Sequence, residues 1–221
     1  MYKFLGFLRQ FPVKRFEKGS IILHQGEVPP YVYVIKRGIV KSYTISDVGD
    51  EKPIAFCMQQ EVMATTWAFQ KSPGTLYFYD AFTECTLYCI PRDELQQFIH
   101  SDKQTLAFFL DHYITKYVGK SVRVNALEYS KAIDKIARTM QYLCHGYGKQ
   151  LKPNLVEIEL PLSQQDIANL TGLTRETTGM ELKKLKQRGI VSYVNRRYTV
   201  KIDELQEFYG EDDFKDIQLR A

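Results

Sequence analysis

Two adjacent residues near the C-terminus, Arg175 and Glu176, have side chains that can distinguish base pairs. An arginine guanidinium can donate two hydrogen bonds to guanine, and a glutamate can accept one from cytosine. Both follow Thr174, a residue type that caps helices, so they fall in the first turn of an expected helix, with Met180 farther along its outer face. The N-terminal end of such a helix enters the major groove in a helix-turn-helix protein, so the pattern predicts recognition of double-stranded DNA.

The elements that must position this pair are two short helices. The first begins at Gln164 after the cap Ser163 and ends at the turn 171–173, where Gly172 can adopt a positive φ; the second ends before Gly189. Their shared core is predicted to contain Ile167, Ala168, Leu173, Leu182 and Leu185. A helical hairpin that only packs is the alternative, and it explains these apolar positions but not an exposed Arg-Glu pair after a cap.

Polar and basic residues around the second helix suit the DNA backbone. Short donors fit phosphate oxygens, and Arg196 with Arg197 at the tip of a β-hairpin (strands 191–194 and 198–202) would form a wing. The predicted DNA-binding residues are Ser163, Gln165, Thr174, Arg175, Glu176, Thr177, Met180, Arg196 and Arg197. The segment 163–202 has eight basic residues against three acidic ones, whereas the tail from 203 has two against seven. A positive segment is typical of nucleic-acid binders, and a solvated charged face is its alternative.

The N-terminal part of the chain has a different pattern. Short runs rich in Val, Ile, Tyr and Phe are separated by Gly, Pro and Asp clusters, which indicates an antiparallel sandwich, barrel or roll. The predicted strands are 20–24, 31–36, 39–45, 53–58, 76–79 and 86–90. Residues 1–9 are expected to form a short surface helix rather than a signal peptide.

Helical periodicity follows from about residue 92. A helix is predicted at 93–100, a longer one at about 102–129 and another at 131–145, before a loop at 147–154 and a strand at 155–160. On the long helix a stripe of heptad spacing is interrupted by Lys120, and its apolar members are Leu106, Leu110, Tyr113, Tyr117, Val124 and Leu127. This spacing favours a seam between two copies of the helix, with a helix that faces its own core as the alternative.

Other chemistries find little support. The four cysteines have no metal-binding spacing and, as free thiols, fit a reducing cytoplasm; the four histidines are scattered. No apolar run is long enough to span a membrane, so a cytoplasmic protein without membrane contact is expected. No nucleophile–base pair or phosphate-cradling loop indicates an enzyme.

The sequence resembles the bacterial cyclic-AMP receptor protein / fumarate–nitrate regulator (Crp-Fnr) family over nearly its whole length. The recognition-helix motif Thr174-Arg175-Glu176-Thr177 carries this resemblance in the C-terminal half. A glycine-punctuated pattern carries it in the N-terminal half: Gly19, Ile22, Gly26-Glu27, Tyr33, Ile35, Gly38, Val40 and Tyr43. The resemblance implies a homodimer that binds a palindromic DNA site and recruits or blocks RNA polymerase.

The family's ligand signatures are missing from this chain. Its cyclic-nucleotide cassette has a Gly-Glu pair and then an Arg-Ser or Arg-Thr pair, whereas ungapped alignment places Ala64-Thr65 and Thr75-Leu76 at these positions. Cyclic AMP is therefore not expected to be the effector, because the arginine that would meet its phosphate is absent. The iron–sulfur branch needs a group of N-terminal cysteines, and none precedes Cys57. No cofactor is identified.

A weaker pattern concerns a different effector. Lys120 aligns where the family uses a polar residue to meet the nucleotide base, and Trp67, Phe69, Tyr77 and Tyr79 could contribute aromatic walls. Such a pocket would suit a small aromatic or carboxylated molecule. The alternative is that Lys120 reaches water, pairs with a carboxylate or fixes the dimer register. In that case the aromatic residues simply fill the core.

The expected fold is α+β, with three parts: an antiparallel β-roll of the cyclic-nucleotide-binding type (1–101), a dimerisation helix (102–130) and a winged helix-turn-helix (131–221). The expected function is that of a homodimeric transcription regulator with an effector other than cyclic AMP. An effector-independent regulator and a ligand-binding module that does not act on DNA are the competing hypotheses.

Overall fold

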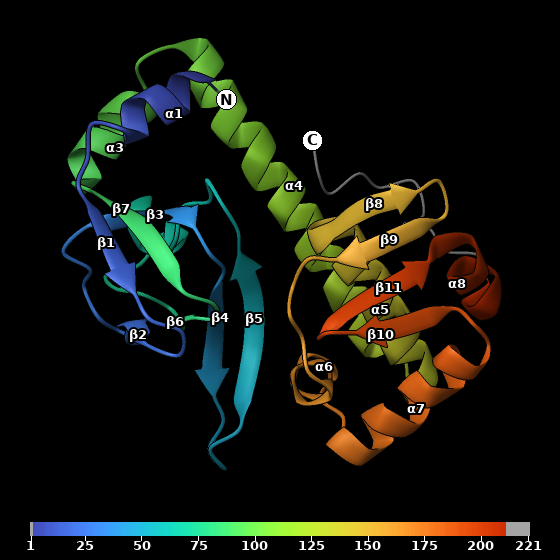
Figure 1. Cartoon of the computed structure of the whole chain (residues 1–221). Helices are drawn as coiled ribbons and strands as arrows, with labels where there is room; N and C mark the ends of the chain where they lie inside the picture. The colour runs from blue at the N-terminus through green and yellow to red at the C-terminus, as the bar shows by residue number, and fades with distance from the viewer. Residues whose placement is uncertain (1, 211–221) are drawn as a thin grey trace. The chain divides into compact units, whose positions relative to one another are not determined.

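The computed structural model describes residues 2–210 and divides the chain into two compact units, Met1–Asp111 and His112–Ala221. The boundary falls inside the long helix α4 (Lys103–Glu128), drawn in green in Figure 1. The predicted extent of this helix, 102–129, is confirmed to within one residue at each end. Each unit has its own sheets and core.

The first unit contains two antiparallel sheets, with strand orders β1-β7-β3 and β2-β6-β4-β5. Its strands are β1 (Val13–Phe16), β2 (Ile21–Leu23), β3 (Val32–Arg37), β4 (Val40–Ile45), β5 (Glu51–Cys57), β6 (Phe78–Ala81) and β7 (Cys85–Ile90). Its helices before α4 are α1 (Tyr2–Leu8), α2 (Thr65–Ala68) and α3 (Arg92–Ile99). The predicted antiparallel β-roll is therefore confirmed, and α1 is the expected short helix.

The core of the first unit lies between the two sheets. Ile35, Val40 and Leu87 are fully buried there, because alternate side chains of each strand point to the same face. Gly38 makes the tight β3–β4 connection: its φ is +95°, and a Cβ at this position would lie 2.3 Å from the carbonyl oxygen of Glu84. The glycine is therefore required by both conformation and space.

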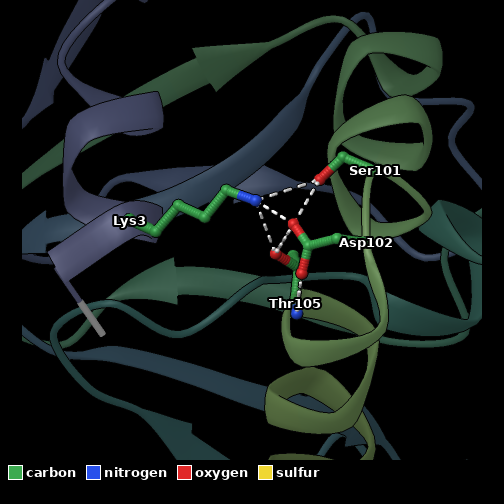
Figure 2. Close-up of polar contacts among 4 residues, drawn as sticks. All are labelled: Lys3, Ser101, Asp102 and Thr105. Atoms are coloured by element: carbon green, nitrogen blue, oxygen red, sulfur yellow. Dashed lines mark hydrogen bonds and ion pairs between the residues drawn. The ribbon is translucent and has the colours of Figure 1, made fainter.

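A group of polar side chains fixes the start of α4 (Figure 2). The Asp102 carboxylate accepts a hydrogen bond from the backbone N–H of Thr105 at 2.8 Å, which is the geometry of a helix cap. Lys3, on α1, forms an ion pair with the same carboxylate, and its Nζ also lies 3.2 Å from the hydroxyl of Thr105. The pKa of Asp102 is held well below its usual range, mainly by the hydrogen bond from Lys3 and secondarily by the one from the Thr105 backbone.

Replacing Asp102 with asparagine should lower the melting temperature slightly at neutral pH, because asparagine keeps the cap but loses the ion pair. Because the pKa of Asp102 is lower in the folded than in the unfolded protein, the ionised carboxylate stabilises the fold. This stabilisation is complete above the unfolded pKa of about 3.9 and is lost progressively as the pH falls below that value. The difference in melting temperature between the two proteins should therefore shrink below about pH 4. A difference that stays constant from neutral to acidic pH would contradict this account.

The second unit begins with the remainder of α4 and is built around α5 (Ala132–Tyr147), whose Ile136, Ala137, Met140 and Leu143 are fully buried. A four-stranded antiparallel sheet of order β10-β11-β9-β8 follows, with β8 (Gly148–Lys152), β9 (Leu155–Ile158), β10 (Val191–Val194) and β11 (Arg197–Lys201). Between β9 and β10 lie α6 (Gln164–Thr171) and α7 (Arg175–Gln187), and α8 (Ile202–Tyr209) ends the described chain.

Some elements differ from the sequence prediction. Residues 148–152 form β8, so the predicted loop at 147–154 is wrong. The side chains of β8 are mostly exposed, which leaves no alternation of apolar and polar residues to signal a strand. The acidic tail begins with the unpredicted helix α8, in which Leu205 is buried. Residues 211–221 of that tail lie outside the described part of the chain.

Candidate DNA-binding site

The helix α6 begins with a reciprocal cap. The hydroxyl of Ser163 accepts a hydrogen bond from the backbone N–H of Asp166 at 3.2 Å, and the Asp166 carboxylate accepts one from the N–H of Ser163 at 2.7 Å. The sequence predicted the Ser163 cap but not its aspartate partner. The helix ends at Gly172, whose φ of +70° confirms the predicted left-handed turn.

The next helix, α7, begins at Arg175, as predicted. The Thr174 hydroxyl accepts a hydrogen bond from the N–H of Thr177 at 3.1 Å and donates one to the Thr177 hydroxyl at 3.0 Å. Arg175 and Glu176 are exposed in the first turn, and the Met180 side chain is 58% exposed one turn later. These three side chains are therefore available to a partner rather than committed to the core.

A small core holds the two helices together. Ile167 and Ala168 of α6 and Leu185 of α7 are fully buried, and Leu182 is 6% exposed. Leu173, between the helices, is half-buried. Four of the five predicted core positions are therefore buried, and together they fix the direction in which α7 presents its first turn.

The hairpin that follows α7 ends in a tight turn. Asn195 and Arg196 both have positive φ, +50° and +62°, as the type I′ turns of two-residue hairpins require. Arg196 is exposed at the tip. Arg197 pairs with Val194 in the strands, and its guanidinium donates a hydrogen bond to the carbonyl oxygen of Glu159. The two predicted wing arginines thus have different environments.

The remaining predicted DNA-contact residue, Gln165, lies exposed on α6, and its amide donates a hydrogen bond to Asn169 at 2.8 Å. The structure therefore collects the predicted DNA-contact residues on the helix-turn-helix and its hairpin (Figure 1). Sequence reasoning did not single out two lysines of α7, Lys183 and Lys186, although their spacing places them near the face that carries Arg175.

The predicted effector residues have separate environments. Tyr79 is in the core of the first unit and Tyr77 packs against that core, while burial raises the pKa of the Tyr79 phenol well above its ordinary value. Trp67 is buried on α2 with the Arg92 guanidinium 5.1 Å from its ring centre. Phe69 is half-buried after α2, and Lys120 is exposed on the part of α4 that belongs to the second unit.

Metal and thiol chemistry depend on the arrangement of the metal-ligating side chains and the thiols. No group of three or more His, Cys, Asp or Glu side chains in the described part of the chain could hold a metal ion. None of the four cysteines forms a disulfide within residues 2–210, and burial raises the pKa of the Cys85, Cys89 and Cys144 thiols. A raised thiol pKa means less of the reactive thiolate at neutral pH.

Two family models match the two units in this order. A cyclic nucleotide-binding domain matches residues 13–102, and a Crp-like helix-turn-helix domain matches residues 134–208. The chain belongs to the Crp-Fnr family of transcription regulators. It is therefore a DNA-binding transcription regulator, and its family is one of regulators rather than enzymes.

Individual relatives are distant but cover most of the regulator. The HTH-type transcriptional regulator ArcR of Staphylococcus haemolyticus is 28% identical over 79% of this chain and 76% of its own. The cAMP-activated global transcriptional regulator CRP of Salmonella typhimurium is 23% identical over 84% of this chain and 88% of its own. The structure of FixK2 from Bradyrhizobium japonicum has a TM-score of 0.74 at 19% identity and covers 91% of this chain and 98% of its own, which shows the shared fold.

No helix of the part of this regulator that the structure describes is long and apolar enough to cross a membrane.

Proposed function

We propose that this regulator is a cytoplasmic homodimer that binds a two-fold symmetric operator and changes transcription there through RNA polymerase. Residues 1–101 would form the effector-type domain, 102–130 the dimerisation helix and 131–221 the DNA-binding domain. The observation that supports this most strongly is the capped first turn of α7, which leaves Arg175 and Glu176 exposed above a fixed core. Each subunit would place this turn in the major groove of one half-site.

An exposed apolar stripe on α4 supports the dimer. The side chains of Leu106, Leu110, Tyr117 and Val124 are 44%, 59%, 72% and 58% exposed in the single chain. Their spacing is that of a coiled-coil seam, so a second copy of the helix would cover them all at once. A stripe of this length would otherwise expose a long apolar surface to water.

The function is tested by mobility-shift assays with genomic fragments of the source organism. The proposal predicts that a small set of fragments binds with nanomolar affinity in the presence of excess unspecific DNA, as specific regulators do. Equal, weak binding to all fragments would contradict it.

The wing should position the protein on the DNA without reading sequence. Replacing Arg196 with alanine should weaken binding to operator and to unrelated DNA by the same factor, since an interaction with a backbone phosphate carries no sequence information. The plot of log K against log salt concentration should also become shallower, by about 0.9 for each phosphate that the variant no longer neutralises. A decrease confined to the operator would assign Arg196 to base recognition instead.

We further propose that the effector is not cyclic AMP. At the position of the family's phosphate-binding arginine stands Thr75, which is 2% exposed and donates its hydroxyl hydrogen to the carbonyl oxygen of His24 at 2.5 Å. Its backbone is paired with Gly26 and Glu27. Thr75 therefore supplies no positive charge and its donor is already used, whereas burying a phosphate requires charge-assisted hydrogen bonds.

Cyclic AMP should accordingly produce no saturable heat in isothermal titration calorimetry and no change in operator affinity at millimolar concentration. A chain carrying Thr75→Arg serves as a second variant that restores the family's cation. Micromolar binding of cyclic AMP to the unchanged protein would contradict the proposal.

A further inference from the structure

A pocket of about 290 Å³ lies between the recognition helix α7 and the wing hairpin β10–β11. Gly179 of α7 lines it, and a Cβ at that position would lie 3.2 Å from the Gln164 amide oxygen, which also lines the pocket. The glycine therefore leaves space that a side chain would fill. The volume is at the lower end of the ~300–1,000 Å³ typical of small-molecule sites, so it suits a small group better than a large effector.

The charge at the pocket is positive. Lys183 and Lys186, both exposed, line it from α7, and neither forms an ion pair with any residue in the range 2–210. By contrast, the neighbouring Lys184 has its Nζ 2.8 Å from a carboxylate oxygen of Glu181. No aspartate or glutamate is among the described residues that line the pocket. Within the described part of the chain, the two lysines therefore give the pocket a positive charge that suits an anion.

Hydroxyl groups contribute from the hairpin side. Tyr198 lines the pocket and is 2% exposed, and its hydroxyl has no hydrogen-bond partner among the described residues. A buried hydroxyl without a partner is costly, so an acceptor bound within its reach would be favoured. Ser192, also in the lining, is exposed, and its hydroxyl shares a hydrogen bond with the hydroxyl of Thr199. The lining thus combines two cations and the Tyr198 hydroxyl with the apolar side chains of Leu182 and Val191. The cations are the groups that match the oxygens of a phosphate.

The position of the pocket indicates where the phosphate would come from. Lys183 follows Arg175 by eight residues on the same helix, which is about 12 Å along its axis. The major groove is about 12 Å wide, so a cation at this distance from the base-reading end reaches the strand that borders the groove. Arg196, at the tip of the same hairpin, is a further exposed cation.

We propose that this pocket binds one phosphate of the operator backbone in each half-site, held by Lys183 and Lys186 and bordered by Gly179, Ser192 and Tyr198. This inference rests on the proposed DNA-binding function and adds to it a specific backbone anchor between the helix and the wing. The anchor fixes how far α7 enters the groove, so it helps to set the register in which Arg175 meets its base.

The test replaces single backbone phosphates of a bound operator with neutral methylphosphonates. In the unchanged protein, one position per half-site should lower affinity on the order of tenfold, as expected when a hydrogen bond to a charged group is removed. In the double variant Lys183→Gln, Lys186→Gln, the same replacement should have no effect. The Lys184→Gln variant is the matched control on the same helix and should keep the sensitivity of the unchanged protein.

Three other outcomes are informative. Identical methylphosphonate profiles for the unchanged protein and the double variant, with specific binding retained, would overturn the inference but leave the proposed function standing. Failure of the unchanged protein to bind any sequence specifically would overturn both. The third outcome combines identical methylphosphonate profiles with saturable binding of inorganic phosphate to the DNA-free protein, which the double variant loses. This outcome would assign the pocket to a free phosphorylated ligand and would also overturn the inference.

Discussion

Replacing Arg175 with alanine will lower operator affinity by about 1–3 kcal/mol per half-site, roughly 5- to 150-fold, and will relax selectivity at one base pair of each half-site. The reason is geometric: the guanidinium can donate two parallel hydrogen bonds to guanine, and no other exposed side chain in the first turn of α7 has this fork. Quantitative mobility shifts on the operator and on single-base variants will measure both effects. The substitution leaves the fold intact, since Arg175 is exposed.

The matched control is Arg175→Lys, which keeps the positive charge and the reach to phosphate but loses the fork. It should retain binding to unrelated DNA while losing selectivity at the same base pair as the alanine variant. If Arg175→Ala bound every operator variant with unchanged affinity and preference, α7 would not be the recognition helix.

Charged substitutions at Leu110 and Tyr117 together will convert the protein into a monomer. Both side chains are more than half exposed on α4, and two glutamates would place like charges opposite each other in a seam formed with a second copy. Sedimentation equilibrium should show half the mass of the unchanged protein. Operator affinity should fall at least about a hundredfold, because linking two binding units raises affinity by ~10²–10⁴ without any new contact.

A glutamate at Gln104 is the control for this experiment, since Gln104 is exposed on α4 but lies outside the stripe. This variant should remain dimeric and bind DNA normally. Circular dichroism of the double variant should show an unchanged helix content. An intact dimer in the double variant would place the subunit interface elsewhere on the molecule.

Local signals in the sequence were sufficient to predict most of the helix-turn-helix. Thr174 and Ser163 cap their helices, and Gly172 has the positive φ that its position between two helices indicated. These features depend on interactions within a few residues, so the chain itself reveals them. The long helix α4 was predicted for the same reason, since its heptad spacing extends over its whole length.

Features that depend on distant partners were not predictable. The strand β1 has mostly exposed side chains and is defined by its pairing with β7, more than 70 residues away, as in Val13 with Tyr88. The pocket at Lys183 and Lys186 exists because β10 and β11 fold back beside α7. In the sequence, those lysines are indistinguishable from Lys184, which is paired with Glu181. The environments of the aromatic residues within 67–79 were not predictable either, because composition does not reveal which of them enter the core.

The central claim is that two copies of α7 read a symmetric DNA site, and repeated selection of binding sequences from a random DNA pool tests it most directly. The account predicts enrichment of an inverted repeat whose half-sites are centred about 10 base pairs apart, or a multiple of that distance, with a guanine contacted by Arg175 in each half. The symmetry should disappear in the Leu110→Glu, Tyr117→Glu variant. Enrichment of a single asymmetric site by the unchanged protein, or of no sequence at all, would contradict the account.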